Sequence, residues 1–356
     1  MVFRIHEKIQ YARTLSSEFY LDEKYFQESK EKIFARSWQL VATVDEVNNL
    51  KPLFLLEDFL SEPILLVRNE SGIICLSNVC THRGKILVEK ACRARLIKCG
   101  YHGRRFDLNG KFLSMPEFEG VEDFPSDEDN LTRIPCEQLS GFVFVSLKPS
   151  FSFPSFFGEV KKVFEQLGWK DLKFVGARDY FVKAHWALYC ENYLEGFHIP
   201  FVHKSLNKVV SDYSTEIFRF SSLQKAFTDE LEASFEFSHN PPYLAALYFF
   251  IFPNLMLNFY PWGLSVNIVK PVKPDETRIS YLTFVADESK LAKGAGANLH
   301  RVEMEDEAVV ESVQKGIRSR FYDRGRYSPS QERCVHHFHR LIAEFMSVEE
   351  TAVENS

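Results

Sequence analysis

The sequence predicts an α+β protein in two parts: a small antiparallel β domain, then a larger domain that combines an antiparallel sheet with helices. From Trp38 onward the chain consists of short β-rich runs separated by Pro, Gly, Asn and Ser, a pattern typical of small β domains. Beyond residue 158, helical periodicities flank longer runs rich in Tyr and Phe, which favour strands. A chain of 356 residues that is 45% hydrophobic is long enough for two moderate cores.

The predicted domain boundaries follow from changes in local composition. Residues 1–37 are charged and helical in pattern, and we expect this lead-in to pack on the larger domain. Its apolar face would consist of Tyr25, Phe26, Ile33 and Phe34. Residues 38–150 would form the β domain and residues 151–356 the larger one, because the segment 148–158 is rich in Pro, Ser and Gly.

Strands are predicted where β-branched and aromatic residues gather between turn signals. In the β domain these runs are 38–44, 63–67, 73–76 and 141–147, and residues 107–110 are typical of a hairpin turn. In the larger domain they are 173–187, 248–252, 255–260 and 264–269, and a helix is predicted over 160–168. The strand pattern indicates an antiparallel sheet with one buried face.

Composition excludes several classes of protein. The net charge of -6 offers no basic stripe to a nucleic acid. The start of the chain lacks the apolar run of a signal peptide, and the longest apolar run, 243–252, is too short to span a bilayer. We therefore expect a cytoplasmic protein. Its cysteines are odd in number and unevenly spread, which favours thiols or metal ligands over a disulfide framework; they are Cys75, Cys80, Cys92, Cys99, Cys136, Cys190 and Cys334.

Two short segments of the β domain each combine one cysteine with one histidine. Cys80-Thr-His82 is followed, after sixteen residues, by Cys99-Gly-Tyr-His102. A Cys₂His₂ zinc site is one interpretation, but zinc fingers usually pair Cys with Cys and His with His. Mixed loops favour a Rieske [2Fe–2S] centre, in which two Cys hold one iron and two His hold the other.

A second candidate metal site lies in the stretch ENYLEGFHIPFVH, residues 191–203. His198 and His203 are five residues apart and would diverge on an unbroken helix, but Pro200 lets the chain turn between them. Glu195 precedes His198 by one helical turn. Two imidazoles and a carboxylate from elsewhere would make the facial triad of non-haem Fe(II). By itself the stretch is equally typical of a helix end with core or capping histidines.

These motifs resemble the Rieske-type ring-hydroxylating oxygenase alpha subunits. CTHRG and CGYHGRRFDLNGKF are similar to the family's Rieske domain, and ENYLEGFHIPFVH is similar to its iron-binding helix. The resemblance implies a helix-grip catalytic domain, a cluster bound by Cys80, His82, Cys99 and His102, and mononuclear Fe(II) bound by His198 and His203. It gives Glu195 the role of carrying electrons from a neighbouring subunit's cluster. Gly100, Arg104 and Glu195 depart from the usual Pro, Trp and Asp of the family.

The third iron ligand is expected in the helical segment 302–320, where four acidic residues compete. Val302, Asp306, Val310, Val313 and Ile317 fall on one stripe. Asp306 is the only carboxylate of that stripe and also matches the position of the family's ligand, so the prediction is Asp306. Glu303, Glu305 and Glu307 are predicted to face solvent.

The C-terminal segment resembles choline monooxygenase and its bacterial relatives within that family. The similarity rests on Gly-Arg-Tyr-Ser-Pro, residues 325–329, followed by His-His-Phe-His, residues 336–339. Since both iron sites already have ligands, we expect His336, His337 and His339 to have a structural or interface role rather than to bind a metal.

The resemblance implies a terminal oxygenase that takes electrons from a separate reductase or ferredoxin, works as a homotrimer, and hydroxylates or N-demethylates a quaternary ammonium compound such as choline or a betaine. Aromatic faces bind such cations, and candidates are Tyr243, Phe249, Phe259, Tyr260 and Trp262, which are equally typical of a core. Two alternatives stay open: a dioxygenase of aromatic rings, and a non-catalytic Rieske electron carrier.

Overall fold

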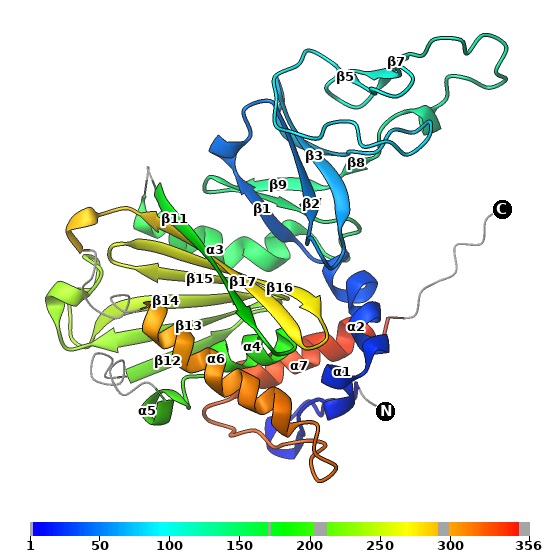
Figure 1. Ribbon diagram of the computed structural model, residues 1–356. Coiled ribbons are helices and arrows are strands. Elements are labelled where there is room, and N and C mark those ends of the chain that lie inside the picture. Colours follow the sequence, from blue (N-terminus) through cyan, green and yellow to red (C-terminus); the bar gives the residue numbers. More distant parts are fainter. Residues whose placement is uncertain (1–2, 170–171, 203–211, 291–298, 349–356) are drawn as a thin grey trace. The chain divides into compact units, whose positions relative to one another are not determined.

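The computed structural model describes residues 3–169, 172–202, 212–290 and 299–348. The chain forms two compact units: Ala35–Phe153 is the smaller, and Met1–Phe34 together with Pro154–Ser356 is the larger. Figure 1 shows the first as a group of small β-sheets and the second as one broad sheet with helices. This is the α+β architecture that the sequence predicts.

The smaller unit contains three antiparallel sheets. The first has the order β1-β10-β9, the second β2-β3-β4-β8 and the third β5-β6-β7. Their bounds are β1 Gln39–Thr43, β2 Leu50–Leu55, β3 Glu62–Asn69, β4 Gly72–Ser77, β5 Ile97–Lys98, β6 Arg105–Phe106, β7 Phe112–Ser114, β8 Arg133–Ile134, β9 Cys136–Leu139 and β10 Phe142–Val145. The predicted hairpin at 107–110 is confirmed, because β6 and β7 pair antiparallel on either side of it.

Strand β3 is buried on both faces, which explains its unbroken apolar run. Ile64 and Leu66 belong to a core shared with β10, whereas Leu65 and Val67 belong to a second core. Successive side chains of a strand point to opposite faces, so this one strand separates the two cores. The second core includes the buried Cys80 and Cys99, so the loops that carry them are supported by packed side chains.

The larger unit is built on a seven-stranded antiparallel sheet with the order β11-β17-β16-β15-β14-β13-β12. Its strands are β11 Lys173–Val182, β12 Asp212–Ile217, β13 Ser221–Thr228, β14 Tyr243–Ile251, β15 Leu255–Tyr260, β16 Gly263–Lys273 and β17 Glu276–Val285. Neighbours from β12 to β17 are consecutive in sequence, and short turns connect them except between β13 and β14, where residues 229–242 intervene. The antiparallel sheet predicted from the Tyr- and Phe-rich runs is therefore confirmed.

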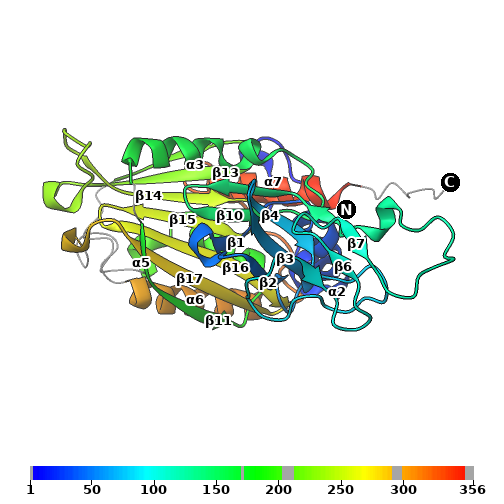
Figure 2. The ribbon, with the colours of Figure 1, turned by 90° about the horizontal axis from the view of Figure 1, so that it is seen from above.

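Helices cover this sheet and connect it to the N-terminal segment. They are α1 Ser17–Leu21, α2 Glu23–Ser29, α3 Phe153–Leu167, α4 Trp186–Tyr193, α5 Ile199–Val202, α6 Leu299–Gly316 and α7 Arg333–Met346. Figure 2 shows α6 alongside β11, with which it is in contact. The N-terminal segment packs in the same unit, where the rings of Phe34 and Trp186 lie 5.0 Å apart.

The predicted limits of one strand and one helix are wrong. The strand predicted over 173–187 ends at Val182, and α4 begins at Trp186 with the His185 side chain accepting from its first turn. Helix α3 begins at Phe153, inside the segment expected to be a break. Pro154 is compatible with this because the first turn of a helix has no internal partner for its backbone donors. The Pro-, Ser- and Gly-rich composition of residues 148–158 therefore coincides with the start of a helix.

The part of the chain that the structure describes contains no helix long and apolar enough to cross a membrane. None of the seven cysteines, all of which the structure describes, is in a disulfide bond.

Candidate iron-sulfur and mononuclear iron sites

The two predicted cluster loops have the same backbone design. In the first, Cys80 N–H donates to the Lys85 carbonyl (2.9 Å), and in the second, Cys99 N–H donates to the Arg104 carbonyl (2.8 Å). Gly84 and Gly103, each four residues beyond its cysteine, donate back to that cysteine's carbonyl. Both glycines have positive φ, 67° and 77°, which glycine adopts without strain. Two tight loops thus present two cysteines and two histidines.

The four predicted ligands separate into a buried pair and an outer pair. Cys80 and Cys99 are buried, whereas His82 is half-buried and His102 exposed. The two imidazole rings lie 4.8 Å apart. This arrangement fits a Rieske cluster, because the thiolates would hold the inner iron and the imidazoles the iron nearest the surface. A donor protein would then reach the histidine side.

Backbone donors favour the thiolate form of Cys99. The Tyr101 N–H lies 3.5 Å from its sulfur. Burial alone would raise the pKa of the Cys99 thiol, but the backbone N–H groups of Tyr101 and His102 outweigh burial and lower it. Burial and the neighbouring His102 lower the pKa of His82, which keeps its ring neutral. A thiolate and a neutral imidazole are the forms that bind metal.

Asp129 connects both loops. Its backbone carbonyl accepts from the Thr81 hydroxyl at 2.9 Å, and its carboxylate forms an ion pair with Arg104. The Arg104 side chain is 2% exposed, and its guanidinium lies 4.9 Å from the ring centre of Phe112 and 5.6 Å from that of Phe124. Arg104, one of the departures from the family, is therefore a buried and paired cation.

In the larger unit, His198 lies between two predicted site residues. Its Nδ1–H donates to Glu195 Oε1 at 2.6 Å, and its Nε2 lies 3.5 Å from Asp306 Oδ1. Because the Glu195 carboxylate holds the proton on Nδ1, Nε2 is the ring nitrogen that could bind a metal. Burial opposes a charge on His198, but the Asp306 and Glu195 carboxylates outweigh it and raise its pKa to about 9. A metal that binds Nε2 would displace the second proton, the one on Nε2, and leave the Nδ1 proton in place.

The local structure around His198 differs from the prediction. Helix α4 ends at Tyr193, and His198 precedes the short helix α5, in which Pro200 occupies the first turn. Glu195 therefore does not share a helix face with His198. Instead, Glu195 Oε2 accepts from the His198 backbone N–H at 3.0 Å, so one carboxylate holds both the backbone and the ring of His198. His203, the other predicted histidine ligand, lies outside the described residues.

Among the described residues, no group of three or more His, Cys, Asp or Glu side chains converges on a point suited to a single ion. A Rieske cluster takes two protein ligands on each iron, and the predicted triad includes His203, which the structure does not describe.

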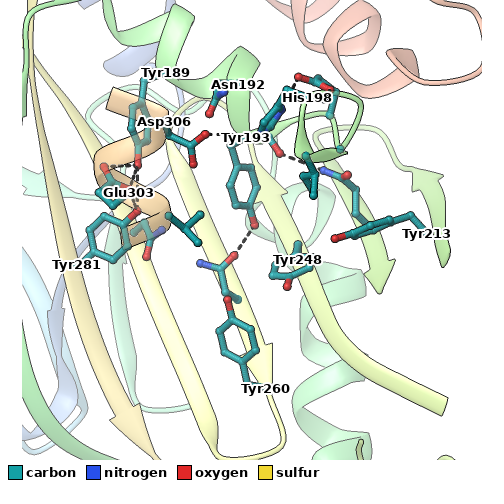
Figure 3. Close-up of a pocket in the computed structure, with 17 residues that line it drawn as sticks. Tyr189, Asn192, Tyr193, His198, Tyr213, Tyr248, Tyr260, Tyr281, Glu303 and Asp306 are labelled. Atoms are coloured by element: carbon teal, nitrogen blue, oxygen red, sulfur yellow. Dashed lines mark hydrogen bonds and ion pairs between the residues drawn. The ribbon is translucent and has the colours of Figure 1, made fainter. Parts of the chain in front are cut away.

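A cavity of about 130 Å³ lies beside His198 and Asp306. It is lined by α4 and the segment that follows it, by α6 and by the sheet, and six tyrosines contribute to the lining, as Figure 3 shows. A single water needs only about 10–15 Å³ on this measure, so the space suits a small organic molecule. The tyrosines are Tyr189, Tyr193, Tyr213, Tyr248, Tyr260 and Tyr281.

Glu303 also lines the cavity, and its predicted exposure to solvent is wrong. It is 3% exposed, and the Tyr189 hydroxyl lies 2.8 and 2.7 Å from its two carboxylate oxygens. The Tyr281 hydroxyl also donates to it. Burial raises the pKa of Glu303 to about 7 despite these phenolic donors, and the nearby Asp306 contributes to the increase.

The buried stripe of α6 is rotated from the predicted one. Val313 is 42% exposed, and Gln314 is buried in its place, where its side-chain oxygen accepts from the His185 backbone N–H at 2.9 Å. Polar residues occupy this face because partners from other elements hydrogen-bond to them, which an apolar periodicity does not reveal. Asp306 stays at the cavity in either register.

Most of the aromatic residues that line the cavity are not among those that the sequence suggests. Of the five suggested from the sequence, Tyr260 lines the cavity and Tyr243 does not, whereas Phe249, Phe259 and Trp262 are core residues. A usable signal was the spacing of Tyr189 and Tyr193, four residues apart in a stretch with candidate ligands, because that spacing places both on one helix face.

The C-terminal histidines participate in packing. The His339 ring is fully buried and lies 2.6 Å from the Tyr327 hydroxyl and 3.1 Å from Glu191. The His336 ring contacts the backbone carbonyl of His6 at 2.8 Å. These contacts agree with the structural role expected for this segment.

The fold and the two sites define an oxygenase of the Rieske non-haem iron class. A model of the Rieske [2Fe–2S] domain matches residues 37–125, and a model of the ring-hydroxylating alpha subunit catalytic domain matches residues 169–348. Choline monooxygenase from Arabidopsis thaliana is 29% identical over 94% of this chain and 83% of its own length. The carnitine monooxygenase oxygenase subunit from Escherichia coli K12 is 30% identical over 94% of both chains.

The chain is also similar to a solved structure, that of a quaternary ammonium Rieske monooxygenase studied for carnitine oxidation and inter-subunit electron transfer. The two superpose with a TM-score of 0.77 at 25% identity, over 97% of this chain and all of the other. The chain thus belongs to the ring-hydroxylating oxygenase alpha subunit family. It is an oxidoreductase with a Rieske [2Fe–2S] cluster and a mononuclear iron. It uses O₂, a small substrate and electrons from a separate reductase.

Proposed function

We propose that this chain is the terminal oxygenase that hydroxylates or N-demethylates a quaternary ammonium compound such as choline or a betaine. The observation that carries the proposal is the tyrosine-lined cavity beside His198 and Asp306. Tyrosine faces attract a cation that has no N–H to donate. The similar proteins act on choline and carnitine, which supports the same class of substrate here.

The proposed assignment of ligands follows the two sites. The cluster would be held by Cys80, His82, Cys99 and His102, and the mononuclear iron by His198, His203 and Asp306. When bound, the iron supplies O₂ activation and the cluster supplies single electrons. Glu195 would keep the Nδ1 proton on His198 and leave Nε2 for the metal, as the 2.6 Å contact supports.

In the proposed reaction one oxygen atom of O₂ is inserted into a C–H bond, either of a carbon attached to nitrogen or of the alcohol carbon. The other oxygen atom is reduced to water by two electrons from the reductase and two protons. Attack on an N-methyl group is followed by loss of formaldehyde, and attack on the alcohol carbon gives an aldehyde hydrate. The tyrosine hydroxyls and the amides Asn258 and Asn267 that line the cavity would orient the polar end of the substrate.

We further propose that the domains divide as 1–37, 38–150 and 151–356, and that the protein is a cytoplasmic homotrimer in which Glu195 carries electrons between subunits. The inter-subunit electron transfer described for the solved relative supports the role proposed for Glu195. Light scattering would measure the oligomeric state. Co-assembled chains carrying Cys80→Ala or Asp306→Ala, each inactive alone, should regain activity together if electrons cross between subunits, whereas transfer within one chain would leave the mixture inactive.

The experiment that tests the proposal is the anaerobic content of iron and acid-labile sulfide, with EPR of the reduced protein. We expect the two irons and two sulfides of the cluster plus one mononuclear iron per chain. His198→Ala should lose only the mononuclear iron and keep the Rieske signal, while the exposed His239→Ala keeps both. Zinc in place of iron, or equal iron in wild type and His198→Ala, would contradict the proposal.

A further inference from the structure

We propose that Glu303 supplies the negative charge that binds the quaternary ammonium group of the substrate, and that it thereby selects a cationic head group over a neutral one of the same shape. The inference deepens the proposed function and rests on it. Glu303 would be a specificity-determining residue of the cavity beside the iron.

The position of Glu303 suits this role. It lies on α6 three residues before Asp306, so the two carboxylates occupy the same side of the helix within one turn. Both line the cavity, and Figure 3 shows Glu303 between Tyr189 and Tyr281 at the side of the cavity nearest Asp306. A positive group near Glu303 would bring its attached carbons close to the proposed iron site.

The charges around the cavity point to a cation. Its described lining contains the carboxylates Glu195, Glu303 and Asp306 and neither Lys nor Arg. Glu195 pairs with His198, and Asp306 faces His198 Nε2 and is the proposed iron ligand. The hydrogen-bond partners of Glu303 are the neutral hydroxyls of Tyr189 and Tyr281. Glu303 is thus the lining carboxylate whose charge is available to a ligand.

The chemistry of a quaternary ammonium fits this arrangement. Such a group has no N–H, so it is held by aromatic faces and a nearby anion rather than by hydrogen bonds. The phenolic donors of Tyr189 and Tyr281 satisfy the carboxylate oxygens and favour their charged form against the effect of burial, and a bound cation would favour that form further. A neutral hydrocarbon in the same cavity would leave a buried carboxylate without a positive partner, which is costly.

The test compares choline with 3,3-dimethylbutan-1-ol, which replaces the charged nitrogen by carbon and keeps the shape. Calorimetry on iron-loaded, anaerobic protein should give at least about a tenfold preference of the wild type for choline. Glu303→Gln should reduce that preference to about twofold or less, and Glu303→Asp should retain most of it. The matched control is Glu305→Gln on the same helix, which removes a carboxylate that pairs with Arg301 and should leave the preference unchanged.

Iron content and the Rieske EPR signal are measured on every variant. A Glu303→Gln protein that keeps both and still prefers choline tenfold would overturn the inference while the proposed function stands. Loss of mononuclear iron from Glu303→Gln would assign Glu303 to holding α6 in place, and would also overturn the inference. A wild type that neither binds nor oxidises choline, carnitine or glycine betaine would contradict the proposed function itself, and the inference with it.

Discussion

The Asp129→Asn substitution would remove the partner of the buried Arg104 guanidinium. Arg104 is 2% exposed, so its charge cannot turn to water when the carboxylate is lost. The same change leaves the Asp129 backbone carbonyl, and hence the hydrogen bond from Thr81, in place. The substitution therefore isolates the ion pair from the backbone link between the cluster loops.

The size of the effect follows from burial. Breaking a fully buried ion pair by removing one partner costs about 3–5 kcal/mol. The Asp129 side chain is 18% exposed, and asparagine still accepts one hydrogen bond, so we expect a loss of about 2–3 kcal/mol. For a unit of this size that loss lowers the melting temperature by about 8–12 °C.

The pH dependence provides an independent check. Burial opposes the charge on Asp129, but hydrogen bonds from Ser126 and Arg104 hold the pKa of its carboxyl below the usual range. A depressed carboxyl pKa contributes stability above the unfolded value of about 3.9, and that stability is lost as the pH falls through the folded pKa. The difference between wild type and Asp129→Asn should therefore shrink below about pH 4.

The assay is thermal unfolding followed by the visible absorption of the cluster, which reports on the smaller unit alone. Glu128→Gln is the matched control, since Glu128 is the exposed neighbour of Asp129 and its substitution changes the net charge equally. We expect a shift below about 1 °C for Glu128→Gln. Equal shifts for the two variants at pH 7 would refute the argument from a buried charge.

Three further predictions concern the larger unit. Burial lowers the pKa of His185 to about 3, so below about pH 6.5 the unfolded chain takes up a proton that the folded chain does not. The free energy of unfolding, measured in urea, should therefore fall by up to about 1.4 kcal/mol for each unit that the pH decreases below about 6.5. His185→Asn should make the free energy of unfolding less dependent on pH in this range. Gly263→Ala would bring a Cβ within 2.2 Å of the Phe284 carbonyl oxygen at a φ of 152°, and should lower the free energy of unfolding by about 2–4 kcal/mol. Gly158→Ala in α3 has open space around it, and should leave the free energy of unfolding unchanged or raise it by about 0.5–1 kcal/mol. Equal melting temperatures for the two variants would contradict this prediction. Glu195→Gln should slow substrate-dependent oxygen uptake by about 10–100-fold with the Rieske signal intact, and an unchanged rate would remove Glu195 from the mechanism.

Local sequence determined much of this protein. The spacing within Cys80-Thr-His82 and Cys99-Gly-Tyr-His102 predicts paired loops, because each loop closes on itself through hydrogen bonds only four or five residues long. Alternating apolar runs predicted most strands, since each run carries its own burial pattern. The sequence predicts Asp306 as a ligand because Val302 and Val310, four residues away on either side, place it on the apolar face of the helix. Such features depend on neighbours in the sequence.

Tertiary structure alone decided the rest of the site. The partners of Glu303 are Tyr189 and Tyr281, 114 and 22 positions away, so no local pattern distinguishes a buried glutamate from a solvent-facing one. The contact between Glu195 and His198 is local in sequence, but it forms across a turn after α4 rather than along a helix face, which helical spacing does not predict. A buried polar group is stable only where the fold brings hydrogen-bond partners to it. The partners of Glu303 on α6 come from α4 and β17, and these three elements meet only once the sheet has formed.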